Sequence, residues 1–386
     1  MKSIGIITIV KVNNYGAELQ AFALQKKIEQ LGYSSEIIDY IYYKNWRFHD
    51  TKESCPLIPM GNKARISYWI KYRLINFILD KIVPLFHKPT SKRLRRFDDF
   101  HKYNTRFSRS YRSMQQLYNT CIDYDIYVVG SDQVWNPAAS SSIEPYFLTF
   151  APKNTKKFSY ASSFGVATIP SGIQERMATL LGNIDTISVR EDSGITLVKQ
   201  LTGKDALLVV DPTLLLTKEE WNNYMKPYPS MPRHYVLIYQ LSESNVIVDA
   251  AMKIGRERNM PVYRICKRSF RVEKNDGVIN ILDAGPAEFL SLIAKADYLV
   301  TNSFHGTAFA VNFNIPFYTI VSSKKNNNSR MVSLLKLLDL SDRLVEEDIC
   351  EDSIDPTKSI DFKKPNDSLT AFRNKSMTYL VSNIQN

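Results

Sequence analysis

The stretch ADYLVTNSFHGTAFAVNFNIPFYTI, residues 296–320, decides the fold. Residues 297–300 and 317–320 are short apolar runs typical of buried strands, and residues 304–312 between them predict a helix. Asn302, Ser303, His305 and Gly306 therefore lie at a strand-to-helix turn, where open α/β sheets bind ligands and where a helix N-terminus attracts anions. Only five histidines occur in the chain. From its position alone, His305 either does chemistry at this turn or only caps it.

The rest of the chain repeats this alternation of strands and helices. Residues 4–10, 16–31 and 34–40 predict a strand, a helix and a strand, which is a βαβ opening and implies a parallel sheet. With 386 residues, the chain is long enough for two domains. A polar stretch with three prolines, residues 227–232, precedes a new strand at 235–239. We therefore expect an α/β protein with two Rossmann-like, doubly wound domains, residues 1–225 and 226–386, facing a cleft.

A basic segment, residues 44–112, interrupts the first domain. It holds 17 Lys and Arg against 5 Asp and Glu, whereas the chain as a whole has a net charge of +11. Apolar residues recur at helical spacing between Ile66 and Ile82, among basic ones. Either this apolar stripe packs on the sheet while the charges face water, or the helix lies on an anionic membrane surface. The second basic cluster, residues 92–96, has no nucleic-acid motif beside it, and we expect no nucleic-acid partner.

Polar side chains follow five of the predicted strands directly, which suggests one shared site. They are Asn14, Tyr15 and Glu18 after the first strand, then Ser131, Asp132 and Gln133, Arg190, Asp211, and Asn302 with Ser303 and His305. Arg190 can bind a carboxylate or phosphate through two guanidinium nitrogens, or form an ion pair with a neighbouring helix. Arg330 starts a helix after a polar run that contains Lys324 and Lys325. A cation at that end opposes the helix dipole, which hints at a bound anion.

The common cofactor and metal motifs are absent from the sequence. We find no GxGxxG, GxxxxGK[ST], HExxH or GxSxG, and the four cysteines form no CxxC, so we expect neither a cofactor nor a metal. The apolar run at the N-terminus is too short for a signal peptide, and no stretch reaches the length of a membrane span. We expect a cytoplasmic protein, or one held at the inner face of the membrane by residues 44–112.

The ordered combination of several stretches resembles the polysaccharide pyruvyl transferase family. These stretches are NNYGAELQAFALQKKIEQLGYSSEIIDY, YDIYVVGSDQVWNP, FSYASSFG, ISVREDSG, VVDPTLLL, TNSFHGTAFA and SRMVSLLKLLDL, which span roughly residues 4 to 340 in order. The resemblance implies a fold like the two-domain GT-B glycosyltransferases. It also implies transfer of a pyruvyl group from phosphoenolpyruvate, as co-substrate, to two hydroxyls of a sugar in a surface or capsular polysaccharide or its precursor, free or lipid-linked.

The resemblance also implies roles for single residues. His305 matches the family's catalytic histidine and Arg190 its anion-binding arginine, while Lys324 or Lys325 with Arg330 fall in the donor-binding region, beside Ser303 and Gly306. The remaining polar residues would line the acceptor side or the cleft. Many members carry an arginine two positions before that histidine, where this chain has Ser303. Two other functions therefore stay open: a GT-B glycosyltransferase that uses a nucleotide sugar, and a non-catalytic glycan-assembly protein.

Overall fold

The structure is a computed structural model that describes residues 2–51, 56–139, 141, 143–270, 277–322, 328–349 and 353–385. The chain forms two compact units. Unit 1 comprises Met1–Ile82, His101–Leu215 and Phe372–Asn386, and unit 2 comprises Val83–Phe100 and Leu216–Ala371. A single boundary at residue 225 would assign three segments to the opposite unit: residues 83–100, 216–225 and 372–386.

Unit 1 is built on a parallel sheet with strand order β3-β2-β1-β4-β5, and a second pair, β6-β7, continues from it through single bridges. The strands are β1 Ser3–Ile7, β2 Ser34–Tyr40, β3 Phe107–Tyr111, β4 Ile126–Val129, β5 Lys156–Ser159, β6 Ile187–Val189 and β7 Ala206–Leu208. Every residue of β4 is buried, as expected for a central strand covered on both faces. The predicted parallel sheet is confirmed.

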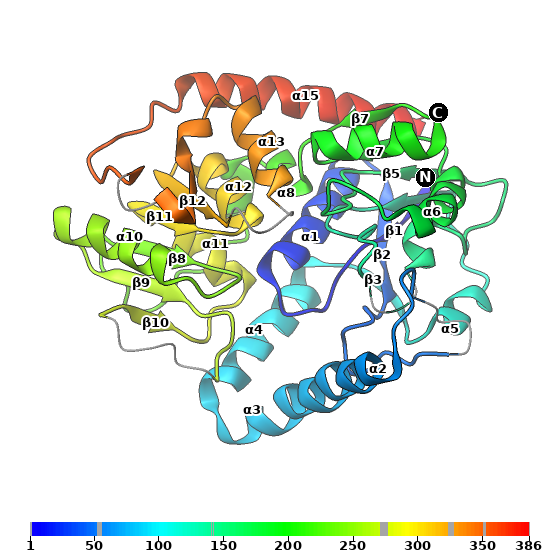
Figure 1. Ribbon diagram of the computed structural model, residues 1–386, viewed down its shortest axis with the longest axis horizontal. Coiled ribbons are helices and arrows are strands. Elements are labelled where there is room, and N and C mark those ends of the chain that lie inside the picture. Colours follow the sequence, from blue (N-terminus) through cyan, green and yellow to red (C-terminus); the bar gives the residue numbers. More distant parts are fainter. Residues whose placement is uncertain are drawn as a thin grey trace. The chain divides into compact units, whose positions relative to one another are not determined.

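The helices of unit 1 follow its strands as crossover connections. They are α1 Tyr15–Gln30, α2 Asn62–Trp69, η1 Ile70–Ile75, η2 Ile78–Ile82, α5 Met114–Tyr118, η3 Glu144–Phe147, η4 Ser171–Ile173, α6 Gln174–Gly182, α7 Asp192–Thr202 and α8 Pro212–Leu215. The first crossover, α1, packs against β2 and α8 (Figure 1).

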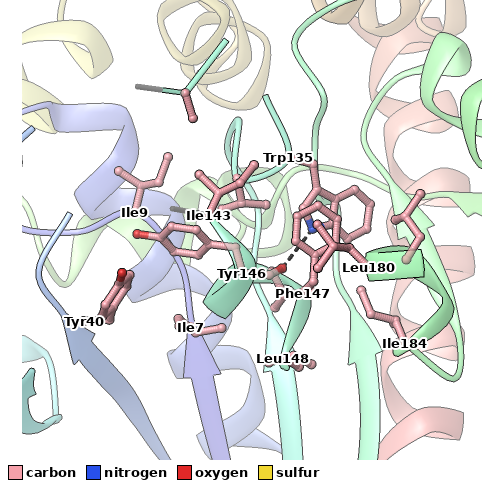
Figure 2. Packing of buried hydrophobic residues seen from close by; sticks show 14 of the residues in the cluster. Ile7, Ile9, Tyr40, Trp135, Ile143, Tyr146, Phe147, Leu148, Leu180 and Ile184 are labelled. Carbon is pink, nitrogen blue, oxygen red and sulfur yellow. Dashed lines mark hydrogen bonds between the residues drawn. The ribbon is translucent and has the colours of Figure 1, made fainter. Parts of the chain in front are cut away.

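An aromatic cluster holds the loop after β4 in the core of unit 1. The Trp135 indole stacks on Phe147 with ring centroids 5.6 Å apart, and its N–H donates to the Tyr146 carbonyl oxygen at 2.9 Å (Figure 2). All three side chains are buried. Because a buried indole N–H needs a partner, this bond fixes the position of the loop that leads out of β4.

Unit 2 is a second parallel sheet with strand order β10-β9-β8-β11-β12-β13. The strands are β8 Val236–Tyr239, β9 Val262–Ile265, β10 Ile279–Ile281, β11 Tyr298–Thr301, β12 Phe317–Val321 and β13 Leu344–Glu346. In sequence terms the order is 3-2-1-4-5-6, the order of a Rossmann sheet. The predicted turn at residues 302–306 is confirmed, because β11 ends at Thr301 and the next helix starts at Phe304.

The helices of unit 2 cover its sheet. They are α3 Val83–Phe86, the first part of α4 Lys88–Asn104, α9 Lys218–Asn222, α10 Asn245–Glu257, α11 Pro286–Ala294, α12 Phe304–Phe313, α13 Ser329–Leu337, η5 Ser341–Arg343, η6 Glu347–Ile349 and the first part of α15 Lys363–Gln385. α10 packs on β8 and β11, and α12 packs on β11 and β12 (Figure 1).

The second part of α15 completes unit 1. Ser376 Oγ accepts the Val210 N–H at 2.9 Å, and the Tyr379 hydroxyl donates to the Ser159 carbonyl oxygen at 3.0 Å. Asn383 accepts a hydrogen bond from the Thr186 hydroxyl. Residues at the far end of the chain therefore supply partners to the backbone at β5 and β7.

The basic segment divides into two parts with different surroundings. In α4, Arg93 donates to the Cys266 carbonyl oxygen at 2.7 Å, Lys92 pairs with Asp283 at 2.8 Å and Arg96 with Glu288 at 3.2 Å, all within unit 2. In the helical run 62–82, by contrast, no residue is buried. The interpretation that its apolar stripe packs on the sheet is therefore wrong.

Candidate active site

The first group of predicted site residues lies in unit 2, where the strand order reverses between β8 and β11. Asn302 joins the loops that follow these two strands. Its side-chain N–H donates to the Ser242 carbonyl oxygen at 2.9 Å, and its Oδ1 accepts the Leu241 N–H at 2.7 Å. The crevice at such a reversal point is the place where parallel sheets bind ligands. Asn302 therefore positions the loops there.

Ser303 is the N-cap of α12. Its Oγ accepts the Gly306 N–H at 3.3 Å, and its own N–H donates to Thr301 Oγ1 at 3.0 Å. A serine at this position accepts a hydrogen bond from the first turn of the helix, which would otherwise lack a partner. Ser303 thus has a structural role at the start of the helix that carries His305.

Gly306 leaves no room for a side chain. A Cβ atom there would lie 2.5 Å from Thr301 Oγ1 and 3.2 Å from Tyr239 Cδ1. Thr301 Oγ1 in turn donates to the Tyr239 carbonyl oxygen at 2.6 Å. The glycine lets the first turn of α12 lie directly against the ends of β8 and β11, so its role here is close packing.

His305 and Arg330 meet on the same aromatic ring. The His305 and Phe304 ring centroids are 5.2 Å apart, and Arg330 Cζ lies 5.9 Å from the Phe304 centroid. His305 is 7% exposed and Arg330 is 8% exposed. The structure thus places the His305 imidazole and the Arg330 guanidinium on one ring, at the start of α12 and α13. Lys324 and Lys325, predicted for the same region, lie outside the described residues.

The second group lies in unit 1, at the reversal point between β1 and β4. Three non-glycine residues in the loops after these strands adopt left-handed backbone conformations: Lys11 with φ 56°, Asn13 with φ 53° and Asp132 with φ 74°. Such conformations cost of order 1–3 kcal/mol each and collect at binding and catalytic sites. Gln133 lies beside them, and its Oε1 accepts from the Asn136 amide at 2.9 Å.

Arg190 is completely buried after β6. Its Nη1 donates to Asp211 Oδ2 at 2.8 Å, and its Nη2 is 3.5 Å from Asp132 Oδ1. Burial by itself would lower the pKa of Arg190, but Asp211, Asp132 and Glu191 together raise it above its usual value. The guanidinium is therefore a permanent buried cation. The structure joins three of the predicted residues, from the loops after β4, β6 and β7, into one network.

Asp211 is the centre of that network. Its Oδ2 also accepts the Ser131 hydroxyl at 2.8 Å, while its Oδ1 accepts the Thr213 N–H at 3.0 Å and hydroxyl at 2.7 Å. The side chain is completely buried. Four donors around one carboxylate hold the loops after β4 and β7 together, so Asp211 and Ser131 have a clear structural role whether or not they also touch a ligand.

The predicted residues after β1 are held in place by local contacts. Asn14 is the N-cap of α1 and accepts from the Gly16 N–H at 3.0 Å, and Tyr15 is buried as the first residue of that helix. Glu18 Oε1 accepts the Val12 N–H at 3.0 Å, and its Oε2 lies 2.7 Å from His101 Nε2. A carboxylate in this position orients an imidazole, as in a catalytic triad.

His101 is the polar residue of this site that sequence reasoning missed. It stands in the basic segment, 83 positions from Glu18, and no local pattern indicates the pairing. The one available signal is that it is among the five histidines of the chain. Among the residues that the structure describes, no three His, Cys, Asp or Glu side chains are placed to hold a metal ion.

Comparison with solved structures shows the fold. A protein assigned as a UDP-N-acetylglucosamine 2-epimerase, from Listeria monocytogenes, matches with a TM-score of 0.50 at 10% identity, over 99% of this chain and 95% of that one. The UDP-GlcNAc 2-epimerase of Neisseria meningitidis bound to UDP-GlcNAc matches at 0.47 and 8% identity, over 100% of both chains. UGT89C1 of Arabidopsis thaliana complexed with quercetin matches at 0.48 and 11% identity, over 97% of this chain and 94% of that one. With its two parallel sheets, the chain has the GT-B-like α/β fold that the sequence predicts.

Comparisons with protein sequences give two further results. No curated protein is detectably similar to the chain. Residues 14–324, well over half of the chain, match the family described as polysaccharide pyruvyl transferase. The matched range contains all of the predicted site residues except Lys325 and Arg330.

Proposed function

Because the chain belongs to the polysaccharide pyruvyl transferase family, we propose that it transfers the pyruvyl group of phosphoenolpyruvate to two hydroxyls of a sugar. The sugar is part of a surface or capsular polysaccharide or its precursor, and the product is a cyclic ketal. Membership of the family makes the chain a transferase. The donor, the acceptor and the residue roles below are the proposal.

The observation that supports it most directly is the arrangement at the start of α12. His305 lies on the first turn, where the helix dipole favours a negative charge, and Arg330 lies on the same Phe304 ring. Phosphoenolpyruvate carries a carboxylate and a phosphate close together, so it needs such a cationic surrounding. It also needs a proton donor that works near neutral pH, for which histidine is suited.

We assign His305 the proton transfers. It protonates carbon 3 of phosphoenolpyruvate, which leaves a cationic centre at carbon 2, and the first sugar hydroxyl forms a C–O bond there as its proton passes to His305. The second hydroxyl then forms the second C–O bond while the bond from carbon 2 to the phosphate oxygen breaks. Its proton leaves with inorganic phosphate. Arg330 and the amides at the start of α12 would stabilise the negative charge of the departing phosphate.

We propose that the unit 1 residues bind the sugar acceptor, with the exception of Arg190. Glu18 and Asp132 can accept hydrogen bonds from sugar hydroxyls, and the strained backbone at Asp132 supports a ligand-binding role. Arg190 stays the predicted donor-binding arginine, although its guanidinium is already paired with Asp211. To bind phosphoenolpyruvate, Arg190 would have to exchange its weaker contact, the 3.5 Å one with Asp132, for a contact with an oxygen of phosphoenolpyruvate.

The experiment that tests the reaction uses phosphoenolpyruvate, a panel of glycan acceptors and deuterated water. We expect phosphate release with one acceptor class and a ketal methyl group that carries one deuterium, because the proton added to carbon 3 comes from solvent through His305. His305→Gln should lower turnover by at least 100-fold, since general acid–base catalysis contributes about 10²–10⁴-fold. His234→Gln is the matched control, because His234 is an exposed histidine of unit 2.

Donor binding is measured separately by thermal stabilisation with phosphoenolpyruvate, UDP and nucleotide sugars. Stabilisation by phosphoenolpyruvate that Arg330→Gln abolishes would support the proposed donor site. Arg190→Lys tests the second arginine in the same titration. Stabilisation by nucleotides alone would exclude this donor and favour sugar transfer. Normal turnover in His305→Gln would exclude the acid–base role of His305.

A further inference from the structure

The helical run 62–82 in unit 1 presents its apolar side chains to solvent. Ile66 and Trp69 are 61% and 57% exposed, and the other members of this apolar face are each between 38% and 45% exposed. The apolar face consists of Ile66, Trp69, Ile70, Leu74, Ile75, Phe77, Ile78 and Ile82. Several members follow one another at every fourth position, so they share a side of the helix. A soluble protein rarely exposes so many large apolar side chains together, and such patches mark interaction sites.

The helix is attached to its own unit through polar side chains instead. The Tyr68 hydroxyl and Arg73 Nη1 both donate to the Tyr43 carbonyl oxygen at 2.8 Å, and the Asn76 amide donates to the Lys44 carbonyl oxygen at 2.8 Å. Arg73 Nη2 also pairs with Asp50 at 2.8 Å. These bonds hold the helix on the loop after β2. Of the apolar face, Phe77 also contacts this loop, since its ring lies edge-on to Trp46 with centroids 5.2 Å apart, but even Phe77 stays 39% exposed.

The charges beside the apolar face are almost all positive. Lys63, Arg65, Lys71 and Lys81 are exposed, and Asp80 is the single acidic residue of the run. A basic helix with an apolar face and an exposed tryptophan has the composition of a helix that lies in the interface of an anionic bilayer. A second copy of the chain would place like charges against one another. Charge complementarity therefore favours an anionic lipid surface over self-association.

The helix does not span the bilayer. Among the described residues, every helix is too short or too polar to cross a membrane. The run of 21 residues can lie flat, with its apolar side chains about 5–10 Å deep in the headgroup region. Each Lys or Arg near an anionic surface contributes about 1 kcal/mol, which is about fivefold in affinity.

We propose that the helical run 62–82 is a membrane-docking surface, which binds an anionic phospholipid bilayer in the plane of its headgroups through the apolar face and the four exposed basic residues. This inference does not depend on the donor or the acceptor of the proposed reaction. It explains why the apolar stripe is not packed on the sheet. It also fits an acceptor carried on a lipid, although it does not require one.

The test is co-sedimentation of the full chain with two kinds of vesicle. One kind is phosphatidylcholine alone and the other contains about one-third phosphatidylglycerol. We expect binding to the anionic vesicles that weakens as salt is raised, because surface charges are screened. Trp69→Ser with Leu74→Ser should lower this binding at least tenfold, and Lys63→Glu with Lys71→Glu should lower it by a similar factor or more.

Two matched controls separate this surface from a general effect of polarity or charge. Ile279→Ser with Val332→Ser changes two apolar residues that are 48% and 42% exposed in unit 2. Lys363→Glu with Lys375→Glu changes two exposed lysines of α15. Both controls should bind vesicles like the unaltered chain.

Three results would overturn the proposal. The first is that the unaltered chain binds neither kind of vesicle. The second is that the variants of the apolar face bind as well as the controls. The third is that sedimentation without vesicles shows a dimer that Trp69→Ser with Leu74→Ser abolishes, while no vesicle binding occurs. That last result would assign the apolar face to a second copy of the chain.

Discussion

Replacing Gly306 with alanine tests the packing that positions His305. The new Cβ atom would lie 2.5 Å from Thr301 Oγ1, and the two atoms must separate by roughly 1 Å to reach van der Waals contact. The Thr301 hydroxyl cannot move freely, because it donates to the Tyr239 carbonyl oxygen at 2.6 Å and accepts the Ser303 N–H at 3.0 Å. The substitution therefore overpacks a buried turn and breaks at least one buried hydrogen bond.

The size of the effect follows from three contributions. Overpacking costs about 1–3 kcal/mol. A buried group left without its hydrogen bond costs about 1–3 kcal/mol. The better helix propensity of alanine offsets about 1 kcal/mol. We expect a net loss of about 3 kcal/mol and a melting temperature lower by about 6–12 °C, since 1 kcal/mol corresponds to about 2–4 °C in a domain of this size.

The assay is thermal unfolding of Gly306→Ala, with Gly182→Ala as the control. Gly182 ends α6, and a Cβ atom added there would have no other atom within 4 Å, so its substitution should leave the melting temperature nearly unchanged. The double variant Gly306→Ala with Thr301→Ala removes the clashing oxygen and should lose less than the sum of the two single variants. The contact does not constrain the turn if Gly306→Ala melts at the same temperature as the unaltered chain. The same holds if the double variant loses as much stability as the two single variants together.

Three further predictions concern buried contacts away from His305. Asp211→Asn should lower the free energy of unfolding by about 3–5 kcal/mol in denaturant unfolding, because the substitution leaves the buried Arg190 cation without its carboxylate. The control Asp205→Asn, at an exposed ion pair, should change the free energy of unfolding by less than about 0.5 kcal/mol. Trp135→Phe should cost about 2 kcal/mol, since the Tyr146 carbonyl oxygen loses its indole donor; a neutral result would show that this bond does not fix the loop after β4. Burial raises the pKa of Asp283, but hydrogen bonds from Lys92 and Tyr228 and the charge of Arg96 outweigh this and hold the pKa below its usual value. The ionised Asp283 therefore stabilises the fold above the unfolded-state pKa of about 3.9, and this stabilisation is lost as the pH falls through the lower folded-state pKa. Stability should therefore fall more steeply between pH 5 and 3 in the unaltered chain than in Asp283→Asn, and equal slopes would contradict this.

Local patterns predict the elements well because each element depends on residues that are near one another in sequence. The pattern predicts a helix at 16–31 where α1 runs Tyr15–Gln30, and the turn at residues 302–306 lies where the sequence places it. The first strand, predicted at 4–10, ends at Ile7. Beyond that strand, the Thr8 hydroxyl donates to the Ser131 carbonyl oxygen at 2.7 Å, a contact across 123 positions that no local pattern indicates.

The sequence alone does not show which residues pair when they are far apart along the chain. Arg190 and Asp211 are both candidates because they follow strands, yet only the strand order shows that they meet. His101 and Glu18 are 83 positions apart, and Arg96 and Glu288 are farther apart still. The orientation of the run 62–82 is also undetermined by the sequence, because helical periodicity shows that one side is apolar but not which way that side faces.

The position of α15 has a consequence for how the chain folds during synthesis. Unit 1 contains the N-terminus, but Ser376 Oγ accepts the Val210 N–H just after β7, and the Tyr379 hydroxyl donates to the Ser159 carbonyl oxygen of β5. The ribosome makes Ser376 and Tyr379 only after all of unit 2. Domains usually fold in the order in which they emerge. Here we expect the reverse: residues 83–371 can complete unit 2 while unit 1 still lacks its last helix. A nascent chain stopped before residue 372 should therefore show a protease-resistant unit 2 and an unfinished unit 1, which leaves the earlier-made half exposed to chaperones for longer.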